Sequence, residues 1–534
     1  MLSKLTSNPK NDILSGLTVA LALVPEAVAF AFVAGIDPMV GLYGAFMMGI
    51  VTSLIGGRPG MISGATGAMA VVMVHLIQRG NQVGLELLSP IDNLGLYWLF
   101  FTLLIVGVIQ ASAGFLKLGK FVRLIPHPVM LGFVNGLAIV IFLSQLGMFK
   151  ETVNGEKLWI NGSELALMLL LVALTMSIMF LLPKITKKVP SALVAILVIA
   201  MLTIFGGLDV STVGSFIHEG GGSGLQGTLP SFQSDIFSII YTMTGEWSMI
   251  ISTAFLLAAV GLIESLMTLN LVDEITNSRG SGNRECIAQG TANIINGLFG
   301  GMGGCAMIGQ SIINVNSGGR GRLSGIIAAM ALLSFILFGA PLIEQIPIAS
   351  LVGVMFMVVI GTFAWSSFRI LNKIPLSDTV VLITVSAVTV WQDLAIAVIV
   401  GVVMSALVFA WKNATMIRAR KVIKNDGTKV YEIWGPLFFG SVQTFNTKFD
   451  PENDPEMIEI DFIESKVSDH SAIEALRNVA NKYLDLGKNV RLTHLSEDCK
   501  AMLLKRNPEF ETIIEHSVDD PRYYVMTDLI DKEI

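Results

Sequence analysis

Charge is scarce in this sequence. Asp, Glu, Lys and Arg together make up 14% of the 534 residues, whereas hydrophobic residues make up 53%, and the mean hydropathy is +0.69. A soluble globular protein of this length needs more charge on its surface, so the composition excludes that class and indicates a chain that crosses a membrane many times. Cysteine is also rare, and Cys286, Cys305 and Cys499 show neither a disulfide framework nor zinc-site spacing.

Sequence signatures of catalysis are missing as well. We find no catalytic triad and no metal cluster in the sequence. The glycine-containing stretch at 280–285 has no preceding strand and no following Lys-Ser/Thr, so it is not a phosphate-binding loop. The chain is therefore expected to be neither an enzyme nor a cofactor carrier.

Apolar segments of about bilayer-spanning length recur along the first three quarters of the chain. Two of them are interrupted by glycine and one is short and amphipathic, and together they give a predicted count of fourteen: 13–34, 39–55, 61–78, 94–116, 129–149, 163–183, 190–207, 248–270, 286–299, 305–317, 323–340, 350–368, 376–391 and 393–411.

Basic residues are distributed unevenly among the loops between these segments. With the N-terminus inside, Lys and Arg gather in the cytoplasmic loops, for example Lys120, Arg123, Lys187 and Lys188, whereas the long outer loop at 208–247 is acidic. This positive-inside asymmetry supports an even number of segments and places both termini in the cytoplasm.

The segments fall into two halves, at about residues 13–207 and 248–411. Each half carries a carboxylate in the middle of its first helix, Glu26 in one and Glu264 in the other. Because seven segments per half is an odd number, the halves are expected to be inverted across the membrane, as in alternating-access transporters.

Two glycine-rich stretches occupy corresponding places in the halves: GGRPGMISGATGAMAVVMV at 56–74 and NIINGLFGGMGGCAMIGQSIINVNSGGRGR at 293–322. Broken backbone at membrane depth survives only where it is buried in protein or lines a cavity. A matched pair of interrupted segments points to a transporter binding site. The alternative is that the small residues only allow close helix packing.

Each interrupted segment is expected to be a short extended piece followed by a helix. The free N–H groups of a helix N-terminus carry about half a positive charge, so two such ends suit a small inorganic anion without a basic side chain. The candidate anion-binding residues lie at the predicted helix starts: Ser63, Ala65, Thr66, Gly67, Ile308, Gly309, Gln310 and Ser311.

The two glutamates also need an explanation, because a carboxylate at membrane depth costs roughly 2.5–3.5 kcal/mol. One interpretation is that Glu26 and Glu264 are hydrogen-bonded groups that hold helices together. The other is coupling: an ionised glutamate repels an anion, and a proton or cation at that place removes the repulsion. Thr268, one turn after Glu264, can offer an oxygen to a small hard cation.

After Trp411 the hydrophobic runs shorten and charge rises, which predicts a small cytoplasmic α/β domain. Residues 431–445 are expected to form two strands around a turn at Gly435 and Pro436. Two further strands are expected at Met457–Ile463 and 489–495, an amphipathic helix at 471–486, and a last helix from 495.

These features together resemble the SulP anion permeases, in which a fourteen-helix inverted repeat precedes a cytoplasmic STAS domain. The resemblance spans nearly the whole chain and rests on five stretches: PEAVAFAFVAGIDPMVGLYGAF (25–46), ISGATGAMAVV (62–72), IESLMTLNLVDE (263–274), NRECIAQGTANIINGLFGG (283–301) and SGGRGRLSG (317–325).

The resemblance implies a core domain that carries the anion and moves against a gate domain, in a homodimer. In the sodium–bicarbonate branch of the family, the site residues correspond here to Thr66, Glu264, Thr268 and the segment 306–308. Ala306 and Met307 are thereby expected at the coupling ion, which Glu264 and Thr268 would ligate if it is Na⁺.

Three departures from the family pattern bear on mechanism. The bicarbonate branch has Asp at Glu264, which leaves Na⁺ or H⁺ coupling open, and some bacterial members share an acid at Glu26 that is linked to proton coupling. Animal relatives often have Arg at Gln310, so its absence favours symport with a cation. In the C-terminal domain Ser471 is a candidate phosphosite, although the sequence favours a helix N-cap role for it.

The sequence thus predicts an all-α polytopic membrane domain at 1–415, with fourteen transmembrane segments in a 7+7 inverted repeat, and a small α/β STAS domain at 425–534. The expected function is symport of a small inorganic oxyanion, bicarbonate before sulfate, with Na⁺ or H⁺ across the cell's inner (plasma) membrane, without a nucleic-acid partner. The alternatives are an uncoupled exchanger or channel, and a sensor or scaffold centred on the STAS domain.

Overall fold

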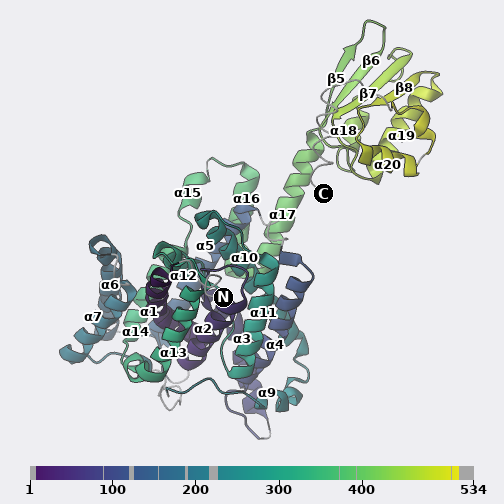
Figure 1. The fold of residues 1–534 in the computed structure, drawn as a ribbon. Coiled ribbons are helices and arrows are strands. Elements are labelled where there is room, and N and C mark those ends of the chain that lie inside the picture. The colour runs from purple at the N-terminus through teal and green to yellow at the C-terminus, as the bar shows by residue number, and fades with distance from the viewer. Residues whose placement is uncertain are drawn as a thin grey trace. The chain divides into compact units, whose positions relative to one another are not determined.

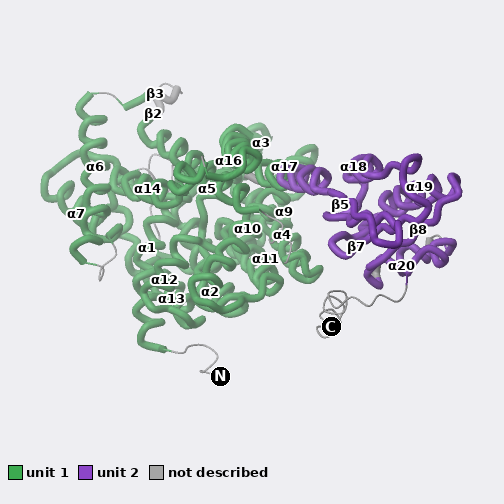
Figure 2. The backbone as a smooth tube through the Cα atoms, turned by 90° about the horizontal axis from the view of Figure 1, so that it is seen from above, with its two compact units in different colours: residues 1–402 green, residues 403–534 purple. Residues whose placement is uncertain are grey.

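The computed structural model describes residues 8–87, 89–119, 126–153, 156–160, 162–186, 191–215, 227–371, 373–392, 394–506 and 508–515. The loop residues Lys120, Arg123, Lys187 and Lys188 lie outside these ranges, as does the end of the predicted STAS domain, 516–534. The chain divides into two compact units, residues 1–402 and 403–534, which are coloured separately in Figure 2.

Unit 1 is built of helices, labelled in Figure 1, and the last helix of the series begins in unit 1 and ends in unit 2. The helices that coincide with the predicted apolar segments are α1 (Pro9–Ala34), α2 (Pro38–Ile55), α3 (Gly67–Glu86), α4 (Leu94–Phe115), α5 (His127–Gln145), α6 (Gly162–Ile185), α7 (Ser191–Gly206), α10 (Trp247–Thr276), α11 (Gly282–Phe299), α12 (Ile308–Asn316), α13 (Arg322–Glu344), α14 (Ile348–Thr362), α16 (Leu376–Trp391) and α17 (Leu394–Thr415).

Shorter elements connect these helices: η3 (Leu146–Phe149), β2 (Lys150–Val153), β3 (Glu156–Trp159), α9 (Asp235–Ser238), η4 (Ile240–Met243) and α15 (Ser366–Ile370). By length and hydropathy, nine helical stretches among the described residues are able to cross a membrane. The predicted segments outside that set are the shorter helices α7 and α16 and the more polar or interrupted α3, α11 and α12.

Both predicted interruptions are confirmed. β1 (Ser63–Ala65) precedes α3, and β4 (Gly304–Ala306) precedes α12. The two strands pair antiparallel, with Gly64 opposite Cys305, and every residue of both is buried. Each strand thereby supplies the hydrogen-bond partners that a broken helix lacks in an apolar interior.

The helices of unit 1 form two groups. α1, α2, α3, α4, α10, α11, α12 and α13 contact one another around the strand pair, whereas α5, α6, α7, α14 and α16 contact one another apart from it. The groups meet mainly where α14 and α7 contact α1 and where α5 contacts α3. Both views place α6 and α7 at the margin of unit 1 (Figures 1 and 2). The inversion of the two sequence halves stays a prediction.

Unit 2 contains the predicted α/β fold. Its sheet has the order β5 (Arg418–Ile423), β6 (Lys429–Trp434), β7 (Met457–Glu464) and β8 (Asn489–Thr493), with β5 and β6 antiparallel and the other pairs parallel. The helices are α18 (Val442–Asn446), α19 (His470–Asp485) and α20 (Glu497–Arg506), followed by η5 (Pro508–Thr512). The apolar face of α19, including Leu476 and Tyr483, is buried in the same core as the sheet residues.

The predicted second strand at 436–445 is wrong. After Gly435, whose φ is 93°, the chain makes one bridge from Leu437 to Val467 and then forms α18. The Ser441 hydroxyl accepts a hydrogen bond from the Phe438 N–H, and Pro436 has no N–H to donate. These local bonds compete with a strand ladder. The sequence interpretation also missed β5, whose charged residues suit an edge strand.

The predicted N-cap role of Ser471 is also wrong. Asp469 caps α19: one carboxylate oxygen accepts from the Ala472 N–H at 2.9 Å, and the other accepts from the Phe439 N–H at 2.8 Å. The carboxylate of Asp469, two residues before Ser471, therefore serves as the N-cap of α19. Ser471 is exposed inside the first turn.

A buried carboxylate organises the core of unit 2. Asp454 accepts hydrogen bonds from the hydroxyls of Tyr431, at 2.6 Å, and Tyr483, and it forms an ion pair with Lys429. Burial by itself raises the pKa of the Asp454 carboxyl, but the bonds from Lys429 and the two tyrosines outweigh it and lower that pKa below its usual value. The ionised form therefore stabilises the folded domain.

We expect Asp454→Asn to destabilise unit 2 by about 2 kcal/mol, because hydrogen bonds to a charged group contribute roughly 1.5–3 kcal/mol each. Hydrogen exchange of the solubilised full chain should then be about thirtyfold faster in β6, β7 and α19. Since the folded pKa is lowered, the stabilisation is present above the unfolded pKa of about 3.9 and is lost as pH falls through the folded value. Asp450→Asn, at an exposed carboxylate, is the control; equal exchange in both variants would contradict the assignment.

Candidate functional site

The strand pair β1–β4 is held in place by polar side chains along one face of α11. Asn293 donates to the Gly304 carbonyl and accepts from the Gly304 N–H, both at 3.1 Å. Gln289 donates to the Ser63 hydroxyl at 2.9 Å and to Glu285 at 2.7 Å. Asn293 therefore holds β4 and Gln289 holds β1, although the two strands come from opposite halves of the sequence.

The two helix starts differ in their surroundings. A methyl group at Gly309, in the first turn of α12, would meet no atom within 4 Å, and this residue is exposed. A methyl at Gly67, which begins α3, would lie 2.7 Å from the Phe30 ring and 3.1 Å from Ile141. Neither helix has a side-chain cap. The α12 terminus thus presents free N–H groups to open space, whereas the α3 terminus is covered.

The remaining predicted anion ligands lie along the same strand–helix junctions. The Ser311 hydroxyl accepts from the Ile62 N–H at 3.0 Å, so it ties α12 to the residue before β1. Ser63 and Ala65 are buried strand residues, and Ile308 is half-buried beside Gly309. The structure therefore brings all eight predicted residues into one region, with Ser63 and Ser311 engaged in holding the backbone.

Glu264 on α10 lies against β4 through the cysteine at its centre. The Cys305 thiol donates to Glu264 Oε2 at 2.9 Å, and Cys305 Sγ lies 3.2 Å from the Thr66 hydroxyl. Thr268 Oγ1 lies 2.8 Å from the Glu264 carbonyl oxygen and 3.3 Å from that of Ala306. A carboxylate, a hydroxyl and a carbonyl oxygen are thus gathered from residues that the sequence analysis assigned to a coupling ion.

These oxygens are the ligand types that a small hard cation prefers. Among the described residues, no group of three or more His, Cys, Asp or Glu is able to hold a metal ion. A cation at Glu264 would therefore depend on neutral oxygens such as those of Thr268 and Ala306. Met307 donates its N–H to the Ile62 carbonyl at 2.9 Å, and its own carbonyl accepts from the Ser311 N–H at 3.0 Å in the first turn of α12.

Glu26 forms the other predicted carboxylate contact. Gln310 Nε2 donates to Glu26 Oε1 at 2.7 Å, which joins α1 to the first turn of α12. The two predicted coupling acids therefore touch different parts of the interrupted segments: Glu264 contacts β4 and Glu26 contacts α12.

The sequence analysis did not identify four residues of this region: Cys305, Ser265, Gln289 and Asn293. Ser265 accepts from the Ala306 N–H at 3.1 Å. Gln289 and Asn293 lie four residues apart in the predicted segment 286–299, and Glu285 lies four residues before Gln289, just outside that segment. This periodicity was a usable signal of an inward polar face. Cys305 gave no such signal, because its role depends on contacts with distant residues.

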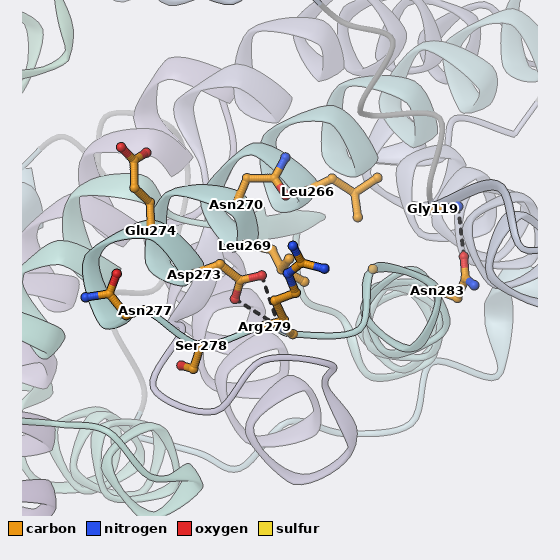
Figure 3. A pocket seen from close by; sticks show the side chains of 12 residues that line it. Gly119, Leu266, Leu269, Asn270, Asp273, Glu274, Asn277, Ser278, Arg279 and Asn283 are labelled. Atoms are coloured by element: carbon orange, nitrogen blue, oxygen red, sulfur yellow. Dashed lines mark hydrogen bonds between the residues drawn. The ribbon is translucent and has the colours of Figure 1, made fainter. Parts of the chain in front are cut away.

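A separate cavity of about 690 Å³ lies at the C-terminal end of α10 (Figure 3). Asp273 on its wall accepts hydrogen bonds from the Gly280 N–H and forms an ion pair with Arg58 at 3.0 Å. Leu269 also lines the cavity and packs with Met61 and Ala306. The lining of this cavity includes none of the predicted ligands, but Leu269 belongs to the same hydrophobic cluster as Ala306, which was assigned to the coupling ion.

Interrupted helices that meet inside a bundle of apolar helices, with carboxylates at the break, define a membrane transport protein. The model of the sulfate permease family matches residues 10–385. The chain belongs to this family of anion transporters.

Two relatives align over nearly the whole chain. The putative sulfate transporter YbaR of Bacillus subtilis (strain 168) is 39% identical over 497 residues, which cover 93% of this chain and 96% of that protein. The bicarbonate transporter BicA of Synechocystis sp. is 29% identical over 556 residues, which cover 98% of this chain and 94% of that protein.

Solved structures agree with this assignment. The transmembrane domain of a cyanobacterium bicarbonate transporter BicA is similar with a TM-score of 0.60 and 30% identity, covering 74% of this chain and 98% of that one. Murine Slc26a9 in the inward-facing state gives a TM-score of 0.78 at 16% identity, covering 98% and 92%. The latter likeness shows a shared fold, and it extends over both units.

Two glycines of this region make a matched pair for a test of the site's geometry. In Gly304→Ala the methyl would lie 2.2 Å from the Gly64 carbonyl oxygen, so the strands must separate and the folded protein is expected to be lost or several degrees less stable. Gly309→Ala is expected to fold as the parent does, because its methyl meets open space. Thermal unfolding followed by size-exclusion chromatography measures both, and similar losses in the two variants would contradict the open α12 terminus.

Proposed function

We propose that this protein is a secondary active transporter that moves a small inorganic oxyanion together with Na⁺ or H⁺, with bicarbonate preferred over sulfate. The anion binds at the first turns of α3 and α12 through Ser63, Ala65, Thr66, Gly67, Ile308, Gly309, Gln310 and Ser311. The coupling ion binds among Glu26, Glu264, Thr268, Ala306 and Met307.

One observation carries this proposal: the chain Thr66–Cys305–Glu264, with contacts of 3.2 and 2.9 Å. It joins a residue at the anion site to the carboxylate at the cation site through one side chain. An ionised Glu264 without a companion cation places negative charge beside the anion site, and a bound cation or proton cancels it. Binding of each ion then favours binding of the other by the same factor.

The choice of anion rests on chemistry and on the relatives. Helix N-termini and hydroxyls suit oxyanions generally. Two proteins named as bicarbonate transporters align over more than nine tenths of this chain, and a putative sulfate transporter is among the relatives too, so both anions belong in the test. The absence of an arginine at Gln310 removes a fixed positive charge, which favours dependence on a cation.

The proposal includes an elevator movement, in which the helix group around β1 and β4 slides against the group of α5, α6, α7, α14 and α16. We also propose an inverted 7+7 repeat, a domain boundary between residues 415 and 425, a homodimer, and an inner-membrane location with both termini in the cytoplasm. Ser471, exposed near the start of α19, is the proposed regulatory position.

We expect Glu264→Gln to abolish accumulation driven by the coupling ion, because the amide removes the charge that a cation or proton neutralises. Coupling energies of 1–3 kcal/mol correspond to about 5- to 150-fold. Uptake of labelled bicarbonate and sulfate into proteoliposomes, with an imposed Na⁺ or H⁺ gradient, measures this. Ser252→Ala is the control, since this exposed hydroxyl on the same helix donates to the Met249 carbonyl of its own helix at 2.9 Å.

The same assay separates the alternatives. Flux that is indifferent to Na⁺, to pH and to Glu264→Gln would identify an uncoupled exchanger or channel. Loss of all function after deletion of 425–534, with anion binding retained, would identify a sensor centred on the C-terminal domain. If neither anion accumulates under either gradient, the symport proposal is wrong.

A further inference from the structure

The last turns of α17 belong to the same compact unit as the C-terminal sheet. Unit 2 begins at residue 403 and α17 ends at Thr415, so Figure 2 colours the end of this helix with unit 2. The stretch Ile396–Thr415 has 20 residues and is apolar enough to cross a membrane. At a rise of 1.5 Å per residue it spans about 30 Å, the thickness of the hydrocarbon core, so Thr415 lies near the membrane surface.

Three large apolar side chains of unit 2 are exposed beside the end of α17. Met416 directly follows the helix and is 56% exposed, Trp434 at the end of β6 is 49% exposed, and Phe439 in the next loop is 68% exposed. Trp434 lies opposite Arg418, the first residue of β5, in the sheet register. We call Met416, Trp434 and Phe439 the apolar patch of unit 2.

The loop that carries Phe439 packs against the last turn of α17. A methyl group at Gly440 would lie 3.1 Å from the Ala414 methyl, and a methyl group at Gly435 would lie 3.3 Å from the Met416 carbonyl oxygen. The apolar patch therefore lies beside the point at which the helix reaches the membrane surface.

Hydrogen bonds hold this loop in place. The Leu437 N–H donates to the Lys466 carbonyl and the Leu437 carbonyl accepts from the Ser468 N–H, both at 2.9 Å. The Phe439 N–H donates to the Asp469 carboxylate at 2.8 Å. The Phe439 ring is thus kept outside the core by a well-bonded backbone. Large apolar side chains that gather on a surface in this way mark an interaction site.

The other end of unit 2 offers a comparison. Among the described residues after α17, the remaining large apolar side chains that are exposed are Ile423, Leu484 and Leu486. Ile423 ends β5, about 17 Å along the strand from Arg418. Leu484 and Leu486 lie at the C-terminal end of α19, whose N-terminal end is bonded to the Phe439 loop. These three residues are therefore distant from the apolar patch.

Basic side chains flank the apolar patch. Lys412 lies in the last turn of α17, Arg418 is exposed at the start of β5, and Lys466 is exposed in the segment bonded to the Phe439 loop. The exposed carboxylate of Glu464, opposite Trp434 in the register, offsets part of this charge. Aromatic rings combined with Lys and Arg are typical of membrane interfaces, and anionic lipids attract basic segments that adjoin a membrane-spanning helix.

We propose that the apolar patch inserts into the surface of the membrane that α17 crosses, with anionic phospholipid as its partner. The side chains of Met416, Trp434 and Phe439 enter the boundary between headgroups and acyl chains, and Arg418 and Lys466 contact the phosphates. Lipid then fastens unit 2 to the bilayer at a second place besides α17. This inference goes beyond the proposed function, because it depends on neither the transported anion nor the coupling ion.

Fluorescent labelling of the full-length protein in lipid nanodiscs tests the proposal. The native cysteines are buried, so an introduced exposed cysteine takes up a nitrobenzoxadiazole label selectively, with the parent protein as the labelling control. We expect lipids with brominated acyl chains to quench the label at Phe439→Cys and at Met416→Cys by about twofold or more. Ile423→Cys is the matched control, because Ile423 is also 68% exposed, and its label is expected to show no quenching.

The lipid headgroup is tested with the same labelled protein. Quenching at Phe439→Cys is expected to be greater in nanodiscs that contain phosphatidylglycerol than in phosphatidylcholine alone. Adding Arg418→Gln together with Lys466→Gln is expected to abolish that increase, whereas Lys482→Gln, in the last turn of α19, is expected to leave it unchanged.

Each other outcome overturns the proposal. A label at 439 that is shielded from water but not quenched by brominated lipid would show that protein, such as a second copy of the chain, covers the apolar patch. A label that stays in water at 439 and 416, or equal quenching at 423, would exclude a specific lipid contact. Equal quenching in the two lipid mixtures would exclude the anionic partner. Thermal unfolding shows whether each variant is folded, and Met416→Cys decides the question if Phe439→Cys is not.

The result is independent of the symport proposal. Gradient-driven uptake by the parent protein is measured separately, so transport without lipid contact, or lipid contact without transport, identifies which of the two proposals is wrong.

Discussion

Backbone hydrogen bonding inside an apolar bundle is the constraint on which this structure depends. Two helices are broken at a depth where lipid offers no partner, so the broken pieces must satisfy each other. β1 and β4 do so by pairing, and Asn293 of α11 and Ser265 of α10 bond further backbone groups of β4. Gln289 of α11 bonds the Ser63 hydroxyl of β1. Everything at the candidate site, including the free terminus of α12, is positioned by this buried scaffold.

The same scaffold explains why the two carboxylates have different partners. Glu264 reaches the interior of β4 through Cys305, whereas Glu26 reaches the first turn of α12 through Gln310. A thiol can only weakly donate or accept, but an amide has a distinct donor end and acceptor end. The two carboxylates therefore contact the interrupted segments through side chains of different chemistry, a thiol at Glu264 and an amide at Glu26.

The surroundings of the α3 and α12 N-termini differ more than the similarity of the two glycine-rich stretches suggests. Gly67 and Gly309 hold similar places after their strands, yet Phe30 and Ile141 cover Gly67, whereas no atom of the described residues lies within 4 Å of a methyl group at Gly309. The two glycine-rich stretches account for the two breaks, and the side chains that cover Gly67 come from α1 and α5, outside these stretches. Side chains outside the glycine-rich stretches therefore determine which of the two helix starts is covered.

The sequence by itself determined the apolar segments, both interruptions, the strands at β7 and β8 and the helix α19, because periodicity and glycine content are local properties. It placed a second strand where α18 lies and chose Ser471 over Asp469 as the cap of α19, since competing local hydrogen bonds decide such details. Only the tertiary structure decided that Cys305 joins Thr66 to Glu264 and that Gln310 meets Glu26. Those partners are separated by dozens to hundreds of residues, and no local pattern encodes a contact that exists only after the helices have packed.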